Sequence, residues 1–154
     1  MPRIEHVVHI ASPPRLVFDV TNDIDRWTEL FDSYAASEVL SREDAGRFSK
    51  LTFRLRNTEG QEWRSWRILD HRDLVSISER EDPLYPFQFM HLKWLYQPES
   101  GGTLMSWTLD FEVHPELADR QRTMLAHMDE HGRQNQLRLK DLLESGRLAG
   151  RGAA

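Results

Sequence analysis

The sequence predicts an α+β fold in which a seven-stranded antiparallel sheet curls around one long C-terminal helix. Three observations support this: a first strand followed by two short helices, six further strands joined mostly by short polar loops, and a long helical pattern at the end of the chain. A sheet curled on a single helix leaves a space between them unless the helix fills it. The sequence therefore also predicts an interior ligand cavity.

The first strand is predicted over residues 3–11, where side chains alternate between the two faces. Ser12-Pro13-Pro14 ends this strand and predicts the start of a short helix, because a serine hydroxyl can cap free N–H groups and proline suits the first helical turn. Residues 24–31 have Trp27, Leu30 and Phe31 at helical spacing, which predicts a second short helix.

The central part of the chain reads as a run of six strands, over residues 35–42, 48–56, 62–71, 74–81, 87–97 and 103–112. Most of the joints are short polar segments typical of antiparallel hairpins. Residues 82–86 include two prolines, which cannot donate to a sheet, so a longer loop at the rim is expected there.

After Pro115 the pattern becomes helical and continues to about Ser145, with Gly146 placed as a C-terminal stop. One stripe of this helix carries Met124, Met128, Asn135, Leu139 and Leu142. The length of 154 residues predicts a single domain over residues 1–146, and residues 147–154 are expected to form a frayed tail.

Composition excludes several classes of function. The formal net charge of −5 argues against a protein that reads nucleic-acid phosphates, and the absence of cysteine excludes disulfides and thiolate chemistry. No apolar run approaches the roughly 20 residues needed to cross a bilayer, and the N-terminus lacks the pattern of a signal peptide. A cytoplasmic protein without nucleic-acid or membrane partners is expected.

The run Trp63-Arg64-Ser65-Trp66-Arg67 is the most informative segment for function. Along a strand Trp63, Ser65 and Arg67 share one face, and Arg64 and Trp66 share the other. Each face therefore mixes aromatic and polar groups, whereas an ordinary half-buried strand separates them. A polar group inside a cavity walled by aromatic rings is the simplest explanation.

Besides the order of the elements, the chain carries a set of motifs spread over nearly its whole length: Asp19 to Ile24, Trp27, Glu29 to Phe31 and Tyr34; Glu62 to Arg67; Pro86 to Tyr96; Gly101 to Thr103; Trp107; and Asn135. In the order of its elements and in these motifs the chain resembles the aromatase/cyclases of bacterial aromatic polyketide synthesis, the polyketide cyclase/dehydrase family of the START-like, helix-grip superfamily. The Trp-x-Ser-x-Arg strand and the Trp-x-x-Leu-Phe-x-x-Tyr segment are narrower signals than the helix-grip outline.

The resemblance implies a cavity in which an arginine on an inner strand is the central polar group. Carried onto this sequence, that residue is Arg67, with Tyr34 and Ser65 as catalytic companions and Asn135 as a further polar contact. The implied walls are Trp27, Phe31, Trp63, Phe87, Met90, Trp94 and Trp107. Strand parity places Phe87 and Trp94 on opposite faces of a regular strand, so a bulge is needed if both line the cavity.

The function implied by the resemblance is cyclisation of a linear poly-β-ketone held on the acyl carrier protein of a type II polyketide synthase. Methylenes between two carbonyls are already acidic, so regiospecific aldol closure and dehydration need mainly correct folding of the substrate and stabilisation of enolate charge. Arg67 can hold a carbonyl oxygen, and Tyr34, Ser65 or water can relay protons. No cofactor is expected, and none of the usual phosphate-loop or Ser/His/Asp signatures is present.

Simpler interpretations remain open at this point. Arg67 could face solvent and pair with Glu62 or Asp70, Tyr34 could anchor a helix with its hydroxyl at the surface, and Asn135 could lie on an exposed flank. The whole protein could instead be a non-catalytic carrier of a hydrophobic molecule such as a quinone or lipid, or a member of the superfamily that acts through protein contacts.

His127 and His131 are four residues apart on the last helix and superficially suggest a metal pair. They lack the His-Glu-x-x-His arrangement and a third ligand, so a solvated helix face is favoured and no metal is expected.

Overall fold

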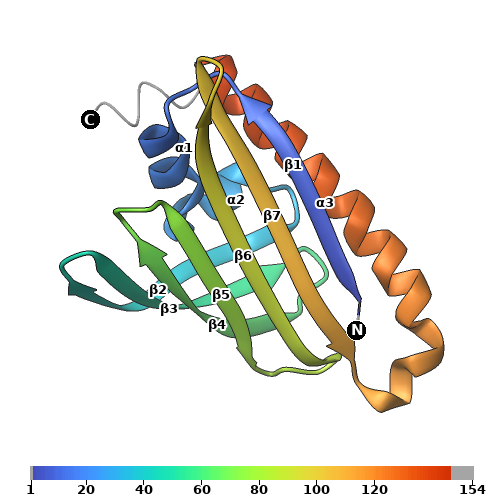
Figure 1. The fold of residues 1–154 in the computed structure, drawn as a ribbon. Helices are drawn as coiled ribbons and strands as arrows, with labels where there is room; N and C mark the ends of the chain where they lie inside the picture. Colours follow the sequence, from blue (N-terminus) through green and yellow to red (C-terminus); the bar gives the residue numbers. More distant parts are fainter. Residues whose placement is uncertain (1, 147–154) are drawn as a thin grey trace.

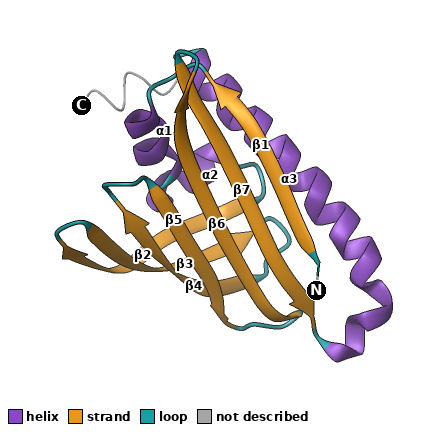
Figure 2. Ribbon diagram, viewed as in Figure 1, coloured by secondary structure: helices purple, strands orange, loops and turns teal. Residues whose placement is uncertain are grey.

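The computed structural model describes residues 2–146 and has one seven-stranded antiparallel sheet with a long helix beside it (Figures 1 and 2). The strand order is β1-β7-β6-β5-β4-β3-β2, so the first strand pairs with the last one and every other neighbour follows in sequence. This confirms the predicted fold class. The expected tail over residues 147–154 lies outside the described residues.

The strands lie close to the positions predicted from alternation. Their bounds are β1 Arg3–Ile10, β2 Tyr34–Ala45, β3 Phe48–Asn57, β4 Glu62–Asp70, β5 Val75–Asp82, β6 Phe87–Glu99 and β7 Gly102–Val113. The helices are α1 Pro14–Thr21, α2 Trp27–Leu30 and α3 Gln121–Glu144, with 3-10 turns η1 Ile24–Arg26 and η2 Pro115–Arg120. None of the described helices is both long and apolar enough to cross a bilayer.

The start of α1 differs from the prediction. Its N-cap residue is Pro13, with no side-chain cap, so the expected capping by the Ser12 hydroxyl is wrong. Ser12 is instead buried, and its carbonyl accepts a hydrogen bond of 2.7 Å from the Thr103 hydroxyl on β7. This tertiary contact fixes the corner between β1 and α1. The predicted stop at Gly146 is confirmed by its φ of 76°, a conformation that glycine adopts readily.

Helix α3 lies alongside β1 and covers the edge of the sheet there (Figure 1). Its side chains satisfy backbone groups of the first strand: Gln136 Nε2 donates to the His6 carbonyl at 3.1 Å, and Lys140 Nζ to the His9 carbonyl at 2.6 Å. Just beyond β1, the N–H of Ala11 donates to Glu144 at 2.8 Å. An otherwise open strand edge is thus paired with helix side chains.

The apolar side chains form two clusters. The larger joins α1, α2 and the C-terminal part of α3 to the face of the sheet that carries Leu51, Leu69 and Met105, which we call the inner face. The smaller, at the other end of the sheet, contains Ile4, Phe87, Phe111 and Val113, with Met124 and Met128 of α3 packed against it. The expected methionine stripe of the last helix is therefore part of the core.

Candidate functional site

Strand β4 places its central arginine on the inner face. Alternation buries Ser65, Arg67 and Leu69, whereas Arg64 on the opposite face is exposed. Arg67 is only 1% exposed and is the largest of the fully buried side chains. The solvent-facing alternative for this residue is therefore wrong.

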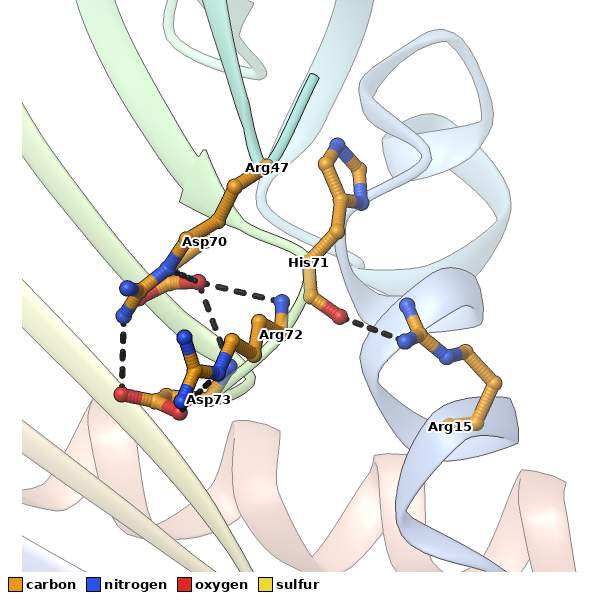
Figure 3. Close-up of polar contacts among 6 residues, drawn as sticks. All are labelled: Arg15, Arg47, Asp70, His71, Arg72 and Asp73. Atoms are coloured by element: carbon orange, nitrogen blue, oxygen red, sulfur yellow. Dashed lines mark hydrogen bonds and ion pairs between the residues drawn. The ribbon is translucent and has the colours of Figure 1, made fainter.

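The acidic residues suggested as surface partners of Arg67 bind other arginines. Asp70 accepts two hydrogen bonds from Arg47, at 2.9 and 2.7 Å (Figure 3). Glu62 lies 3.8 Å from Arg54. Arg67 and Asp70 are three residues apart, and strand alternation puts residues at odd spacing on opposite faces.

Arg67 is held by neutral groups only. Its Nε donates to Asn22 Oδ1 at 2.8 Å and its Nη2 donates to Ser76 Oγ at 3.0 Å. The guanidinium carbon lies 4.2 Å from the ring centroid of Trp94 and 5.3 Å from that of Trp27. Among residues 2–146 no carboxylate forms an ion pair with it, and Nη1 has no acceptor. Burial lowers the pKa of Arg67 to about 10, so the guanidinium stays protonated at neutral pH.

A small hydrogen-bond network surrounds this arginine. Asn22, the residue after α1, donates from Nδ2 to the Phe18 carbonyl at 2.9 Å and to the Tyr96 hydroxyl at 3.2 Å. The Tyr96 hydroxyl also lies 2.6 Å from Thr21 Oγ1. Sequence reasoning did not select Thr21, Asn22, Ser76 or Tyr96. Strand alternation could have indicated Tyr96, because it lies two residues from Trp94 and therefore shares the same face of β6.

Tyr34, expected as a polar companion of Arg67, has its ring in the same aromatic group. Its ring stacks on Trp27, with a centroid distance of 5.7 Å and an angle of 17°. Burial raises the pKa of Tyr34 to about 12, although the positive charges of Arg67 and Arg80 act in the opposite direction. Within the described chain its hydroxyl and that of Ser65 have no hydrogen-bond partner.

Four of the predicted wall residues pack together beside Arg67. Trp94 and Trp107 stack at 4.2 Å with an angle of 11°, and Trp27 stacks on Trp94 at 5.9 Å. Phe31 contacts Trp107 edge-on at 6.3 Å. Trp107 Nε1 is buried and has no acceptor in the structure. The rings therefore close over the arginine and leave one indole donor unsatisfied.

The remaining predicted wall residues make no cation–ring contact with Arg67 in the described chain. A register shift between Phe87 and Phe89 supplies the expected bulge, and Phe87 and Trp94 are both buried. Phe87 and Met90 belong to the smaller core cluster. Trp63 is partly buried, and Arg80 lies over the rings of Trp63 and Phe87, at 4.5 and 5.4 Å.

Arg80 is a second inner-face arginine that sequence reasoning missed. Ser76, Ser78 and Arg80 occupy alternate positions of β5, so strand alternation could have placed Arg80 on the same face as the two serines. Its Nε and Nη2 donate to the carbonyls of Pro83 and Tyr85, at 2.9 and 3.1 Å, and so attach the expected rim loop to β5.

Asn135 is half-buried on α3, and no hydrogen bond joins its side chain to another described residue. Its neighbour Gln136 is the buried amide of this helix and bonds to the carbonyls of β1 and β7. The structure shows no contact between Asn135 and Arg67.

Two hollows of the structure lie away from the aromatic group. One, of about 280 Å³, is lined by residues that include Asp19, Asn22, Asp23 and His71, and the other, of about 530 Å³, lies between residues 11–14 and 98–102. Neither hollow is lined by Arg67 or by the stacked tryptophans, so neither is the cavity expected around Arg67. Asn22, which bonds to Arg67, and Leu51, which pairs with Arg67 across β3 and β4, both line the first hollow.

Within residues 2–146 no group of three or more histidines and carboxylates is arranged to hold a metal ion. The rings of His127 and His131 stack at 6.1 Å on an exposed part of α3.

Comparison with known proteins identifies the family of this chain. The sequence profile described as polyketide cyclase/dehydrase and lipid transport matches residues 1–144. A candidate polyketide cyclase of Streptomyces cyaneus is 41% identical over 117 residues, which cover 73% of this chain and 74% of that protein. A second, of Streptomyces halstedii, is 38% identical over 109 residues, covering 67% of this chain and 94% of that protein.

Solved structures agree on the fold. The Zhui aromatase/cyclase from Streptomyces sp. R1128 superposes with a TM-score of 0.76 at 22% identity, covering 99% of this chain and 98% of that one. A START superfamily protein from Mycobacterium smegmatis has a TM-score of 0.64 at 16% identity, covering 93% and 97%. At these identities the likeness shows the helix-grip fold alone.

Proposed function

This chain belongs to the polyketide cyclase/dehydrase and lipid transport family, and from that membership and its site we propose that it is an aromatase/cyclase of aromatic polyketide synthesis. The proposed substrate is a linear poly-β-ketone carried by the acyl carrier protein of a type II synthase. The proposed reaction is regiospecific aldol closure followed by dehydration to an aromatic ring, without a cofactor.

The chemistry needs a place for negative charge. Loss of a proton from a methylene between two carbonyls gives an enolate, whose carbon forms the new C–C bond with a second carbonyl of the same chain. The resulting alkoxide takes up a proton to give a hydroxyl, and this hydroxyl and a neighbouring C–H proton then leave together as water, which forms the double bond. No oxidant or reductant is consumed, so the protein has to orient the chain, hold the enolate oxygen and relay protons.

One observation carries the proposal: Arg67 is a fully buried guanidinium with no carboxylate partner among the described residues. A buried charge without a counter-ion is costly, and simple packing of a core does not require one. An enolate oxygen at Nη1 would supply the missing negative charge at the stage where the reaction creates it.

Tyr34 and Ser65 are proposed as proton relays on the same face. Because burial raises the Tyr34 pKa to about 12, its phenol is protonated at neutral pH and suits donation to an alkoxide better than removal of a methylene proton. Water is the proposed acceptor of that first proton.

Substrate entry is proposed to involve movement of the rings. Trp27, Trp94 and Trp107 stack on one another beside Arg67, so we propose that the polyketide slides between these rings and replaces ring–ring contacts with ring–substrate contacts. The unsatisfied Nε1 of Trp107 would then donate to a carbonyl of the chain.

The main alternative is a carrier of a hydrophobic molecule such as a quinone or lipid. The family description includes lipid transport, but an apolar cargo gives Arg67 no partner and leaves the cost of its burial unexplained. The arginine therefore favours chemistry over carriage.

The test is a minimal type II synthase reconstituted with and without this protein, with products identified by mass spectrometry and NMR. We expect a shift from a mixture of spontaneous products to one aromatic product. Arg67→Ala should abolish that shift while the protein remains folded, and Arg64→Ala, on the exposed face of the same strand, is the matched control. Unchanged product from the Arg67 variant, or no effect of the wild-type protein, would refute the proposal.

A further inference from the structure

The amide of Asn22 is oriented without ambiguity. Its Nδ2 has two acceptors, the Phe18 carbonyl at 2.9 Å and the Tyr96 hydroxyl at 3.2 Å, so the nitrogen must face away from Arg67. The oxygen is left to accept from Arg67 Nε at 2.8 Å. Asn22 is 6% exposed, and its position at the end of α1 is fixed by its own N–H, which donates to the Phe18 carbonyl at 3.1 Å.

The position of Asn22 is where a carboxylate would ordinarily be expected. A buried arginine is usually paired with Asp or Glu, because a charged partner offsets the cost of removing the guanidinium from water. Asn and Asp have the same shape, so an Asp here would also present an oxygen to Nε, although its second oxygen would face the Phe18 carbonyl in place of the Nδ2 donor. The chain has an amide instead.

The other groups around the guanidinium are also neutral. Ser76 accepts from Nη2, and the faces of Trp94 and Trp27 contribute ring electrons but no formal charge. The titratable groups that interact with Arg67 are Tyr34 and Tyr96, and burial raises the pKa of both phenols, which keeps them uncharged. The positive charge of Arg67 is thus held in place and left uncompensated.

We propose that Asn22 is a positioning residue that fixes Arg67 while leaving its charge free to stabilise an anionic oxygen of the ligand. This inference rests on the proposed function. In it, Asn22 and Ser76 hold the guanidinium by hydrogen bonds without neutralising its charge. A carboxylate at either position would hold Arg67 more strongly and would compete with the enolate for its charge.

The test measures charge preference directly, with 4-nitrophenol as a small aromatic probe whose ionised form absorbs visible light. Titration of the probe in excess wild-type protein should give an apparent pKa below that of the free phenol, because the phenolate binds more tightly. Asn22→Asp should reduce this lowering by about one unit or more, a tenfold change in the ratio of the two affinities. Asn22→Ala keeps the charge, so it should retain the preference for phenolate while slowing cyclisation.

A merely structural Asn22 predicts the reverse order. Asp would then lose the two hydrogen bonds donated by Nδ2 but keep the contact to Nε, and Ala, which loses all three, would be the more damaging change. Equal preference for phenolate in the wild type and the Asp variant overturns the inference, as does a wild-type protein that does not prefer the phenolate.

A second pair of variants covers poor folding of Asn22→Asp, which circular dichroism would reveal. Ser76→Asp brings a carboxylate to Nη2 from β5, and Ser76→Asn is its neutral match in shape. The phenolate preference should fall in the Asp variant and persist in the Asn variant, and equal preferences would count against the inference. Because the titration uses no polyketide, a charge effect without any change in synthase products would support this inference and refute the proposed function.

Discussion

The guanidinium of Arg67 lies against the face of Trp94, with 4.2 Å between its carbon and the ring centroid. Trp94 also stacks on Trp107, with 4.2 Å between the two ring centroids. One tryptophan therefore contacts both the buried charge and the aromatic stack, and it couples the stability of the fold to the geometry of the site.

Replacement of Trp94 by alanine should destabilise the protein by about 3–5 kcal/mol, because it removes a buried ring that contacts two other tryptophans and leaves a cavity. Urea unfolding followed by circular dichroism measures this loss. Trp66→Ala, which removes a partly buried tryptophan from the opposite face of the sheet, should cost clearly less. Equal losses would show that the inner stack adds nothing specific.

Tyr34 should remain un-ionised in the native protein until the pH approaches 12. Its folded pKa exceeds the ordinary value of 10.0, so its contribution to stability is complete below pH 10 and is lost as the pH rises through 12. The ultraviolet difference spectrum between wild type and Tyr34→Phe should show no tyrosinate signal below that range. A signal near pH 10 from folded protein would show that Tyr34 is solvated.

Asp70→Asn should lower the midpoint of thermal unfolding at neutral pH by a few degrees. Hydrogen bonds from Arg47, together with those from the backbone of Arg72 and Asp73, hold the Asp70 pKa well below its usual range (Figure 3). The contribution is therefore present above the unfolded pKa and is lost as the pH falls through the folded one.

The difference in stability between wild type and Asp70→Asn should accordingly shrink in strong acid. Asp119→Asn, at an exposed position of η2, is the control and should leave the unfolding midpoint nearly unchanged at every pH. A difference for Asp70→Asn that does not depend on pH would contradict the assignment to ionisation.

Gly102→Ala should destabilise the protein by more than a change at a turn glycine does. A Cβ at this position would lie 2.2 Å from the Ile10 carbonyl oxygen, so the backbone at the β1–β7 corner would have to move. Gly46→Ala, at a φ of 61° with open space around it, should cost only the roughly 1–2 kcal/mol of a left-handed residue. Chemical unfolding of the two variants should show this order, and the reverse order would mean that the corner yields easily.

Local patterns predicted the strands, and the resemblance to the family predicted the burial of Arg67. Alternation placed Ser65 and Arg67 on one face and Arg64 on the other, and the bulge required by Phe87 and Trp94 is present. These features depend on the two-residue period of a strand, which is written in the sequence itself.

The partners of Arg67 could not be predicted in the same way. Asn22 is 45 residues from Arg67, and Tyr96 is 74 residues from Asn22, so their contacts depend on how α1 sits on β4 and β6. The failure of Ser12 as a cap has the same origin, because a tertiary bond from Thr103 holds its carbonyl at the corner. The rings around Arg67 were predicted as walls, but only the three-dimensional packing shows that they stack on one another.

The first strand is held in the sheet by segments that come much later in the chain. β1 pairs with β7, which begins at Gly102, and its carbonyls are bonded by Gln136 and Lys140 of α3. A chain emerging from the ribosome therefore holds its N-terminal segment without either partner until β7 and α3 have been synthesised. Such long-range closure is slow compared with local hairpin formation, and the domain is expected to close only after α3 is available.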